Sequence, residues 1–244
     1  MTKKKSGKTM RLAGLLLVLV LVTSCFVGGT FAKYVTSGTG TDSARVAKFG
    51  VNVNASADSL FQKQYDSDTT GYTAKTVITS NEDKLVAPGT KGDLTAFTVS
   101  GKPEVAVEVK YTVDEFELTN WSIPDTSTGA SAGATVEYCP IVFKVNDTEY
   151  KIDGTTITSV SGLQDAVKNA IQAVTEQVAA NTDLSTAGAV PSLKVEWEWA
   201  FQGTGTDPYQ TDAKDTALGD QAADDTTTAG KIDLQVTMTV TQID

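Results

Sequence analysis

The 244-residue chain contains no histidine. That absence excludes HExxH zinc chemistry, Ser-His-Asp triads and Cys-His dyads, because each of them needs an imidazole. Cysteine is nearly absent too, since only Cys25 and Cys139 occur. If Cys25 leaves with an N-terminal segment, Cys139 has no partner for an internal disulfide. We interpret Cys139 as a small buried apolar residue, because no base is present to activate it as a nucleophile.

Acidic residues are missing from the N-terminus, which carries five basic residues by Arg11 and then an apolar run over 12–22. This pattern predicts a secretory signal peptide over residues 1–32. Small residues at Thr30 and Ala32 place the cleavage after Ala32, so that Lys33 becomes the first mature residue. The apolar run is shorter than the roughly 20 residues of a stable membrane anchor, although a retained anchor remains an alternative.

The sequence also offers a second cleavage site. Residues 22–25 resemble a lipobox, in which Cys25 would become a lipidated first residue that holds the protein on the cell surface. The run stays apolar through Phe26 and Val27, which favours cleavage further along the chain. Intact-mass measurement decides between the two, because a diacylated Cys25 excludes cleavage after Ala32.

The mature chain of about 210 residues is long enough for one sizeable domain. Without the signal it keeps 15 basic and 30 acidic residues, a net charge of −15. A surface this acidic repels nucleic acids and anionic membranes, so we expect neither as a partner. Export without disulfides suggests a Gram-positive host.

Alternation of apolar and polar residues with a period of two dominates the rest of the chain. It predicts strands with one buried and one solvated face over residues 48–54, 104–113, 194–201 and 232–241. Weaker strands are predicted over 76–79, 94–99 and 141–145, the last turning through Asn146-Asp147 into a hairpin. Antiparallel strands joined by turns predict a mainly β chain folded as a β-sandwich over 46–244.

Two segments depart from this pattern. Apolar residues spaced by three and four predict an amphipathic helix over 161–180, with Ser161 and Gln164 as its capping box, and we expect it to cover one edge or end of the sandwich. Residues 203–230 are rich in Asp, Thr, Gly and Ala. Their spacing does not match a calcium-binding loop, so we interpret them as a solvated acidic loop.

No arrangement of residues in the sequence predicts catalysis. Glu196 and Glu198 share the solvated face of one strand, whereas a glycosidase needs two carboxyl groups facing each other across a cleft. We therefore predict that the protein is not an enzyme, and we identify no catalytic, cofactor or metal site.

Short motifs in a consistent order resemble the TasA/camelysin family of secreted proteins. The first motif is the segment after the apolar run, together with residues 44–51. It is followed by a Pro-Gly turn at 85–91, which precedes a strand, and then by the long strand over 105–113. The helix over 161–180 and the closing strands at 193–201 and 232–242 complete the match, which therefore spans the whole chain.

That resemblance implies a jelly-roll-like sandwich that polymerises into extracellular fibres of a biofilm matrix, after cleavage by a SipW-type signal peptidase. It implies copies of the same chain as the main partner, with minor matrix or anchoring subunits as others. The N-terminal segment over 33–45, with Lys33, Tyr34 and Val35 leading it, would enter the next copy as a donated strand. Family members include supposed metallopeptidases, but a chain without histidine lacks the usual zinc ligands. The alternative function is a monomeric surface binding protein or adhesin, held by Cys25 or by the retained signal.

Overall fold

The computed structural model describes residues 14–18, 44–55, 60–66, 74–79, 84–94, 97–201, 210–224 and 226–243. The chain divides into two compact units, residues 1–45 and 46–244. In the first unit, residues 14–18 are helical. No helix within the described ranges is long and apolar enough to span a membrane.

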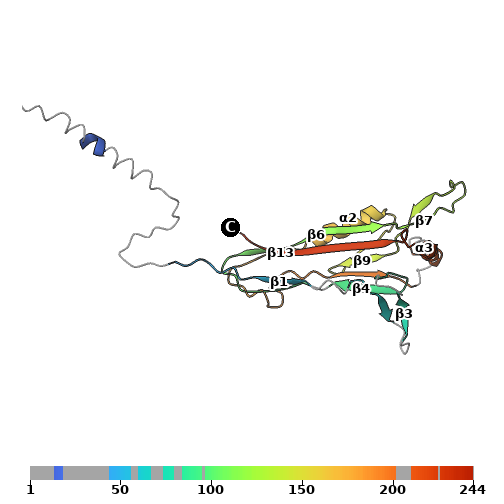
Figure 1. Cartoon of the computed structure of the whole chain (residues 1–244), viewed down its shortest axis with the longest axis horizontal. Helices are drawn as coiled ribbons and strands as arrows, with labels where there is room; N and C mark the ends of the chain where they lie inside the picture. Colours follow the sequence, from blue (N-terminus) through green and yellow to red (C-terminus); the bar gives the residue numbers. More distant parts are fainter. Residues whose placement is uncertain are drawn as a thin grey trace, which may run out of the picture. The chain divides into compact units, whose positions relative to one another are not determined.

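The second unit is mainly β, with several antiparallel sheets and few helices, which confirms the predicted fold class at this level (Figure 1). Its described strands are β1 (Asn52–Ala55), β2 (Gln64–Asp66), β3 (Lys75–Ile78), β4 (Thr90–Leu94), β5 (Phe97–Ser100), β6 (Val107–Thr119), β7 (Ser122–Pro124), β8 (Thr135–Glu137), β9 (Val142–Val145), β10 (Thr148–Tyr150), β11 (Thr175–Val178), β12 (Val195–Trp199) and β13 (Lys231–Gln242). Its helices are α2 (Val160–Gln172) and α3 (Asp212–Asp224).

A three-stranded sheet with the order β11-β6-β13 is built on the two longest strands, which run side by side in Figure 1. Their alternation places Val107, Val109 and Tyr111 of β6 in the core, together with Met238 of β13. The pairing of β6 with β13 contains one bulge, at which Asp114 is the extra residue of β6. Both strands confirm the sequence prediction.

A four-stranded sheet with the order β10-β9-β12-β4 contributes the other large group of core residues. Val195, Trp197 and Trp199 of β12 are buried, as the alternation predicts. The predicted hairpin between β9 and β10 is confirmed, because Asn146 and Asp147 both adopt positive φ angles between paired strands. Positive φ at both central residues is the geometry of a tight type I′ turn.

Helix α2 follows the predicted apolar stripe but is shorter than the predicted range of 161–180. It begins after Ser159, whose hydroxyl accepts a hydrogen bond from the backbone N–H of Gly162 at 3.0 Å. Ser159 therefore replaces Ser161 as the capping residue. Val178 was expected on the helix, but it lies on β11, which pairs with β6. The helix ends at Ala173, and the chain then enters β11.

Helix α2 covers the edge of β6 beyond its pairing with β11. It contacts β6, β9 and β10, and its buried residues are Val160, Leu163, Val167 and Ile171. The backbone N–H of Leu118 donates to the side chain of Gln164 at 3.4 Å, which satisfies one donor of that edge. The expectation that this helix covers an edge of the sheets is confirmed.

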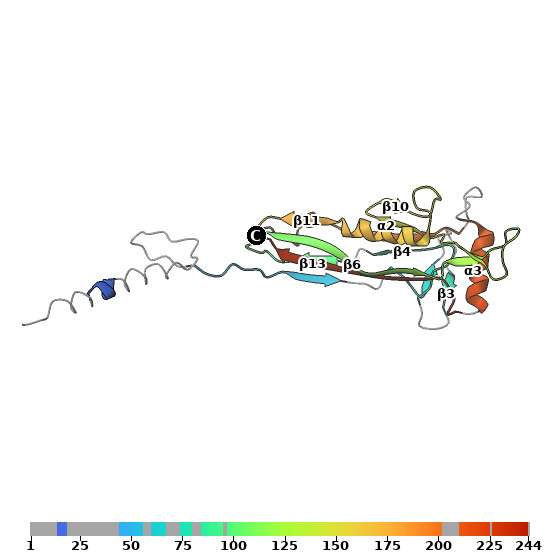
Figure 2. The ribbon, with the colours of Figure 1, turned by 90° about the horizontal axis from the view of Figure 1, so that it is seen from above.

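The segment predicted as an acidic loop over 203–230 contains helix α3 within its described part. The prediction missed it because only Asp215 and Leu218 among its residues are buried, so that no apolar stripe is visible in the sequence. Figures 1 and 2 both place α3 and β7 at one end of the unit. The part of the predicted acidic loop that contains Asp207 lies outside the described residues.

Three strand predictions differ from the structure at their ends. Phe201 was expected on the buried face with Trp197, but β12 ends at Trp199 and Phe201 is 73% exposed. The predicted strand over 94–99 is divided between β4 and β5. Val53 and Phe49 were expected to be buried but are exposed. Phe201 and the divided strand differ because alternation alone does not mark where pairing ends, whereas Val53 of β1 is paired with Val99 and is nevertheless exposed.

Candidate functional site

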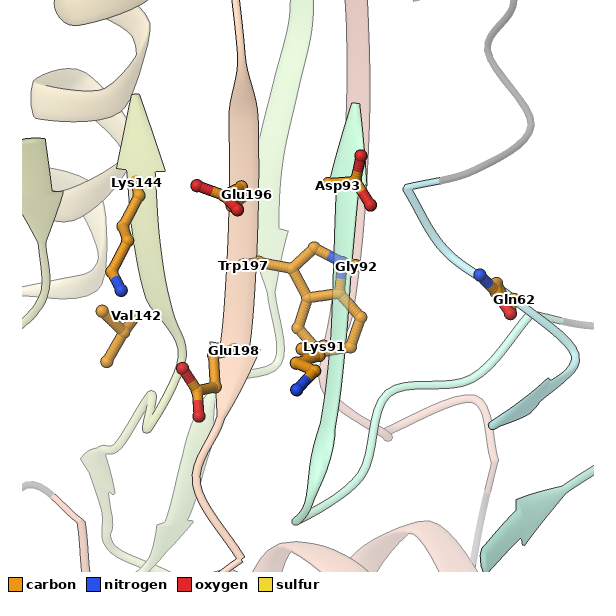
Figure 3. A pocket seen from close by; sticks show the side chains of 9 residues that line it. All are labelled: Gln62, Lys91, Gly92, Asp93, Val142, Lys144, Glu196, Trp197 and Glu198. Atoms are coloured by element: carbon orange, nitrogen blue, oxygen red, sulfur yellow. The ribbon is translucent and has the colours of Figure 1, made fainter. Parts of the chain in front are cut away.

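The wet face of the four-stranded sheet carries a shallow depression of about 290 Å³. Figure 3 shows Glu196 and Glu198 on β12, with Lys144 of β9 on one side and Lys91 and Asp93 of β4 on the other. The register places Glu198 opposite Lys91, and Glu196 opposite both Lys144 and Asp93. The opposite charges of Glu198 and Lys91 and of Glu196 and Lys144 stabilise neighbouring strands, whereas Glu196 and Asp93 carry like charges and repel each other.

The carboxylates of this face lie among cations. Lys194 donates to Glu196 at 2.8 Å, and this hydrogen bond raises the pKa of the Lys194 ammonium. Glu196 and Glu198 project from the same strand, so they do not face each other across a cleft as a pair of catalytic carboxylates would. The arrangement is that of a charged, solvated sheet surface.

The floor of the depression is formed by a close contact between β4 and β12. The indole N–H of Trp197 donates to the carbonyl of Leu60 at 2.6 Å. A Cβ atom at Gly92 would lie 2.0 Å from the same carbonyl oxygen, so only glycine fits there. Gly92 thus lets Leu60 reach the Trp197 indole.

In the described part of the chain, neither Cys139 nor a cluster of metal-ligating side chains forms a reactive centre. Cys139 is buried, as predicted, and desolvation raises the pKa of its thiol to about 12. The thiol is therefore protonated at neutral pH and a poor nucleophile. Across the described ranges, no group of three or more Cys, Asp or Glu side chains is placed to hold a metal ion.

The outer edge of β13 is the longest sheet edge left open among the described residues. β13 is a terminal strand of its sheet and pairs with β6 alone. β1 approaches β13 without pairing with it. The other terminal strands of the two main sheets have three to five residues, whereas β13 has twelve. A strand of this length with one unpaired edge is a template for pairing with another chain.

The hydrogen-bonding pattern identifies which residues present this edge. The N–H of Ile243 donates to Ala106 at 3.0 Å, so Ile243 faces β6, and Thr241, Thr239 and Thr237 do the same. The residues between them direct their N–H and C=O groups away from β6. These outward residues are Val236, Met238, Val240 and Gln242.

β13 carries little of the protection that edge strands usually have. It contains two charged residues, Lys231 and Asp233, both near its start, and no proline, and the one bulge in its pairing lies on β6. Charged residues, prolines and short strands are the common means of preventing pairing at an edge. Its exposed side chains include Thr237, Thr239 and Thr241, and threonine has high β propensity. The edge is therefore suited to accept an added strand.

The sequence-predicted processing and donor residues lie outside the described residues. They are Cys25, Thr30, Ala32, Lys33, Tyr34 and Val35. The described chain resumes at Ala44, and residues 44–50 are exposed and form no strand. Val46 is 91% exposed, and Lys48 is held by Glu104, whose carboxylate accepts its N–H at 2.9 Å. Sequence reasoning found β13 as a strand but not as an edge, since edge position depends on which strands surround it.

Comparison of this chain with protein-family models, with curated proteins and with solved structures finds no match.

Proposed function

We propose that this chain is a secreted structural subunit that assembles into extracellular fibres by strand donation. In this proposal a SipW-type signal peptidase releases Lys33, and residues 33–43 of one copy pair with the outer edge of β13 in the next. The open twelve-residue edge of β13 is the observation that carries the proposal. The resemblance of the sequence motifs to the TasA/camelysin family supports the same function.

We also propose that the two main sheets form the layers of a jelly-roll-like sandwich. The rings of Phe116 on β6 and Phe143 on β9 have centroids 5.4 Å apart at an interplanar angle of 88°. An edge-to-face contact between residues of different sheets supports face-to-face packing. In such a sandwich a strand added to β13 would place alternate side chains toward the core beside Val236 and Met238.

Strand addition supplies affinity through the backbone and specificity through alternate side chains. Residues 33–43 are rich in Thr, Ser and Gly after Tyr34 and Val35. Such a segment satisfies the backbone groups of the edge, and whichever of Tyr34 and Val35 faces the core adds burial, since consecutive strand residues point to opposite faces. Before cleavage, the same residues remain attached to the signal segment, so processing would trigger assembly.

Electron microscopy of the mature chain tests the proposal, with Val240→Pro as the decisive variant. The N–H of Val240 points away from β6, so proline there removes a donor of the open edge but no bond of the β6–β13 ladder. We expect fibres from the wild type and from Val240→Ala, which keeps the N–H, but only monomers from Val240→Pro. Fibres from Val240→Pro would exclude β13 as the acceptor. A wild type that stays monomeric would favour the adhesin alternative.

Processing yields a second testable prediction. Replacing Ala32 with tryptophan places a bulky side chain at a position that signal peptidases require to be small. The precursor should then accumulate in the membrane fraction, and N-terminal sequencing should detect no chain starting at Lys33. The matched substitution Ala44→Trp, twelve residues beyond the expected cleavage site, should leave processing unchanged. Normal release of the Ala32→Trp chain would refute cleavage after Ala32.

A further inference from the structure

Helix α3 is held to the rest of the unit by very few buried groups. Asp215 and Leu218 are its buried residues, and Asp215 is 8% exposed. Carboxylates are rarely buried to this degree without a partner. One of the two anchors of the helix is therefore an ionisable group, whose charge affects how firmly the helix is docked.

A network around the hydroxyl of Tyr138 joins the first turn of α3 to the sheets. The Tyr138 hydroxyl donates to Oδ1 of Asp215 at 2.7 Å and accepts from the N–H of Thr211 at 3.1 Å. Tyr138 is 2% exposed, so the network lies inside the protein. The ammonium of Lys214 lies 5.2 Å from the centroid of the Tyr138 ring.

Trp199 completes the surroundings of Asp215. It is 5% exposed, and its indole N–H acts on the Asp215 carboxyl without reaching the geometry of a regular hydrogen bond. Its ring packs edge-to-face on Trp121 at 5.8 Å between centroids. Helix α3 thus docks over an aromatic surface made by Tyr138, Trp199 and Trp121.

The ionisable and charged groups around Asp215 are few. Burial raises the pKa of the Asp215 carboxyl, and the charge of Asp212 acts in the same direction, whereas the Tyr138 hydroxyl and the Trp199 indole lower it. Lys214 is the cation of this turn, and it lies against the Tyr138 ring. β7, which packs against α3, has no ionisable side chain, and Glu137 at the end of β8 accepts the N–H of Val160.

We propose that helix α3 is a pH-sensitive latch, docked firmly on the Tyr138–Trp199 surface when Asp215 is neutral and loosened when Asp215 ionises. Loosening exposes Trp199 and Tyr138, so the latch controls access to an aromatic surface at this end of the protein. The latch uses neither the β13 edge nor the N-terminal segment, so it stands independently of the proposed fibre function.

The direction of the effect follows from the raised pKa. Docking is strongest below the ordinary Asp pKa of about 3.9, falls by up to about tenfold for each pH unit above it, and levels off at the raised pKa of the docked state. A depressed pKa would give the opposite dependence.

Hydrogen exchange of the full chain between about pH 3 and 8 tests the latch, because the fall begins at the ordinary Asp pKa of about 3.9; detergent is added if the apolar N-terminus requires it. After correction for intrinsic exchange, the protection of α3 relative to β6 should fall with rising pH and then level off. Asp215→Asn, which cannot ionise, should remove this dependence. Asp220→Asn is the matched control, because Asp220 is exposed on the same helix and should leave the profile unchanged.

Tyr138→Phe keeps the test decisive if Asp215→Asn does not fold. It removes the hydrogen bond that lowers the pKa of Asp215, so the fall in protection should extend to higher pH. The latch would be overturned by pH-independent protection of α3 in the wild type, or by a profile in Tyr138→Phe identical to that of the wild type. The same dependence in Asp215→Asn as in the wild type would also overturn it.

Discussion

Replacing Trp197 with alanine is expected to lower the free energy of unfolding by about 3–5 kcal/mol. Trp197 is 1% exposed and is among the largest fully buried side chains of the described core. Its ring contacts Phe61 at 5.5 Å and Tyr65 at 6.1 Å between centroids. Truncation therefore removes a large buried apolar area and leaves a cavity beside Phe61 and Tyr65.

The loss of a hydrogen bond adds to this cost. Without the indole N–H, the carbonyl of Leu60 loses the donor that lies 2.6 Å away. An unsatisfied buried acceptor costs about 1–3 kcal/mol. Trp197→Phe keeps an aromatic ring but not the donor, so its loss of stability should lie between those of alanine and the wild type.

Phe201→Ala is the matched control for Trp197→Ala. Both residues share the alternation of the same sequence segment, but Phe201 is 73% exposed. Its replacement should change the free energy of unfolding by less than about 0.5 kcal/mol. Urea denaturation of the three variants measures the differences. A cost below about 1 kcal/mol for Trp197→Ala, or a larger cost for Phe201→Ala, would contradict this account of the core.

The contrast between Trp197 and Phe201 illustrates what the sequence could and could not predict. Long runs of alternation, as in β6 and β13, predict strands well because many residues report the same period. The end of a strand depends on whether a neighbour is present to pair with it, and that neighbour comes from elsewhere in the chain. Phe201 continues the period of β12 but lies beyond its last paired residue.

Helices α2 and α3 differ for a related reason. The apolar stripe of α2 is visible in the sequence because four of its apolar residues enter the core. Helix α3 lacks such a stripe, since Asp215 takes one of its two buried positions. A buried acid has the same appearance in a sequence as an exposed one, so the segment is indistinguishable from an acidic loop. The buried position of Asp215 is seen only in its tertiary contacts, above all the hydrogen bond that it accepts from Tyr138.

The candidate acceptor edge could be predicted only in part. Alternation over 232–241 predicts a strand whose core side chains are the even-numbered residues. Whether β13 lies at the centre or the edge of a sheet depends on which strands pair with it. The donor half of the proposed interaction comes from sequence reasoning alone, because residues 33–43 lie outside the described residues.

Deleting the donor segment is expected to abolish fibre formation while leaving the fold intact. A variant that starts at Ala44 keeps the whole of the second compact unit, residues 46–244. This variant retains the β13 edge but has no strand to donate, so one copy cannot pair with the next to extend a fibre. Electron microscopy should show monomers, and circular dichroism should show the β content of the longer chain.

A synthetic peptide of residues 33–43 separates strand donation from a general effect of truncation. Added to the variant that starts at Ala44, the peptide should bind β13 and stabilise the folded state by about 2.7 kcal/mol at one hundred times its Kd. For a chain of this length, that corresponds to a rise of roughly 5–10 °C in Tm.

The specificity of this binding can be tested on both sides of the proposed pair. A peptide with proline at Val35 loses a backbone donor and should bind more weakly. The truncated chain carrying Val240→Pro should not respond to the normal peptide, whereas the chain with Val240→Ala should. Fibres from the variant that starts at Ala44 would eliminate strand donation by residues 33–43. Proline at position 240 removes a backbone donor from the outer edge of β13 alone. A peptide-induced rise in Tm that persists in the Val240→Pro chain would therefore show that the peptide binds elsewhere than on β13.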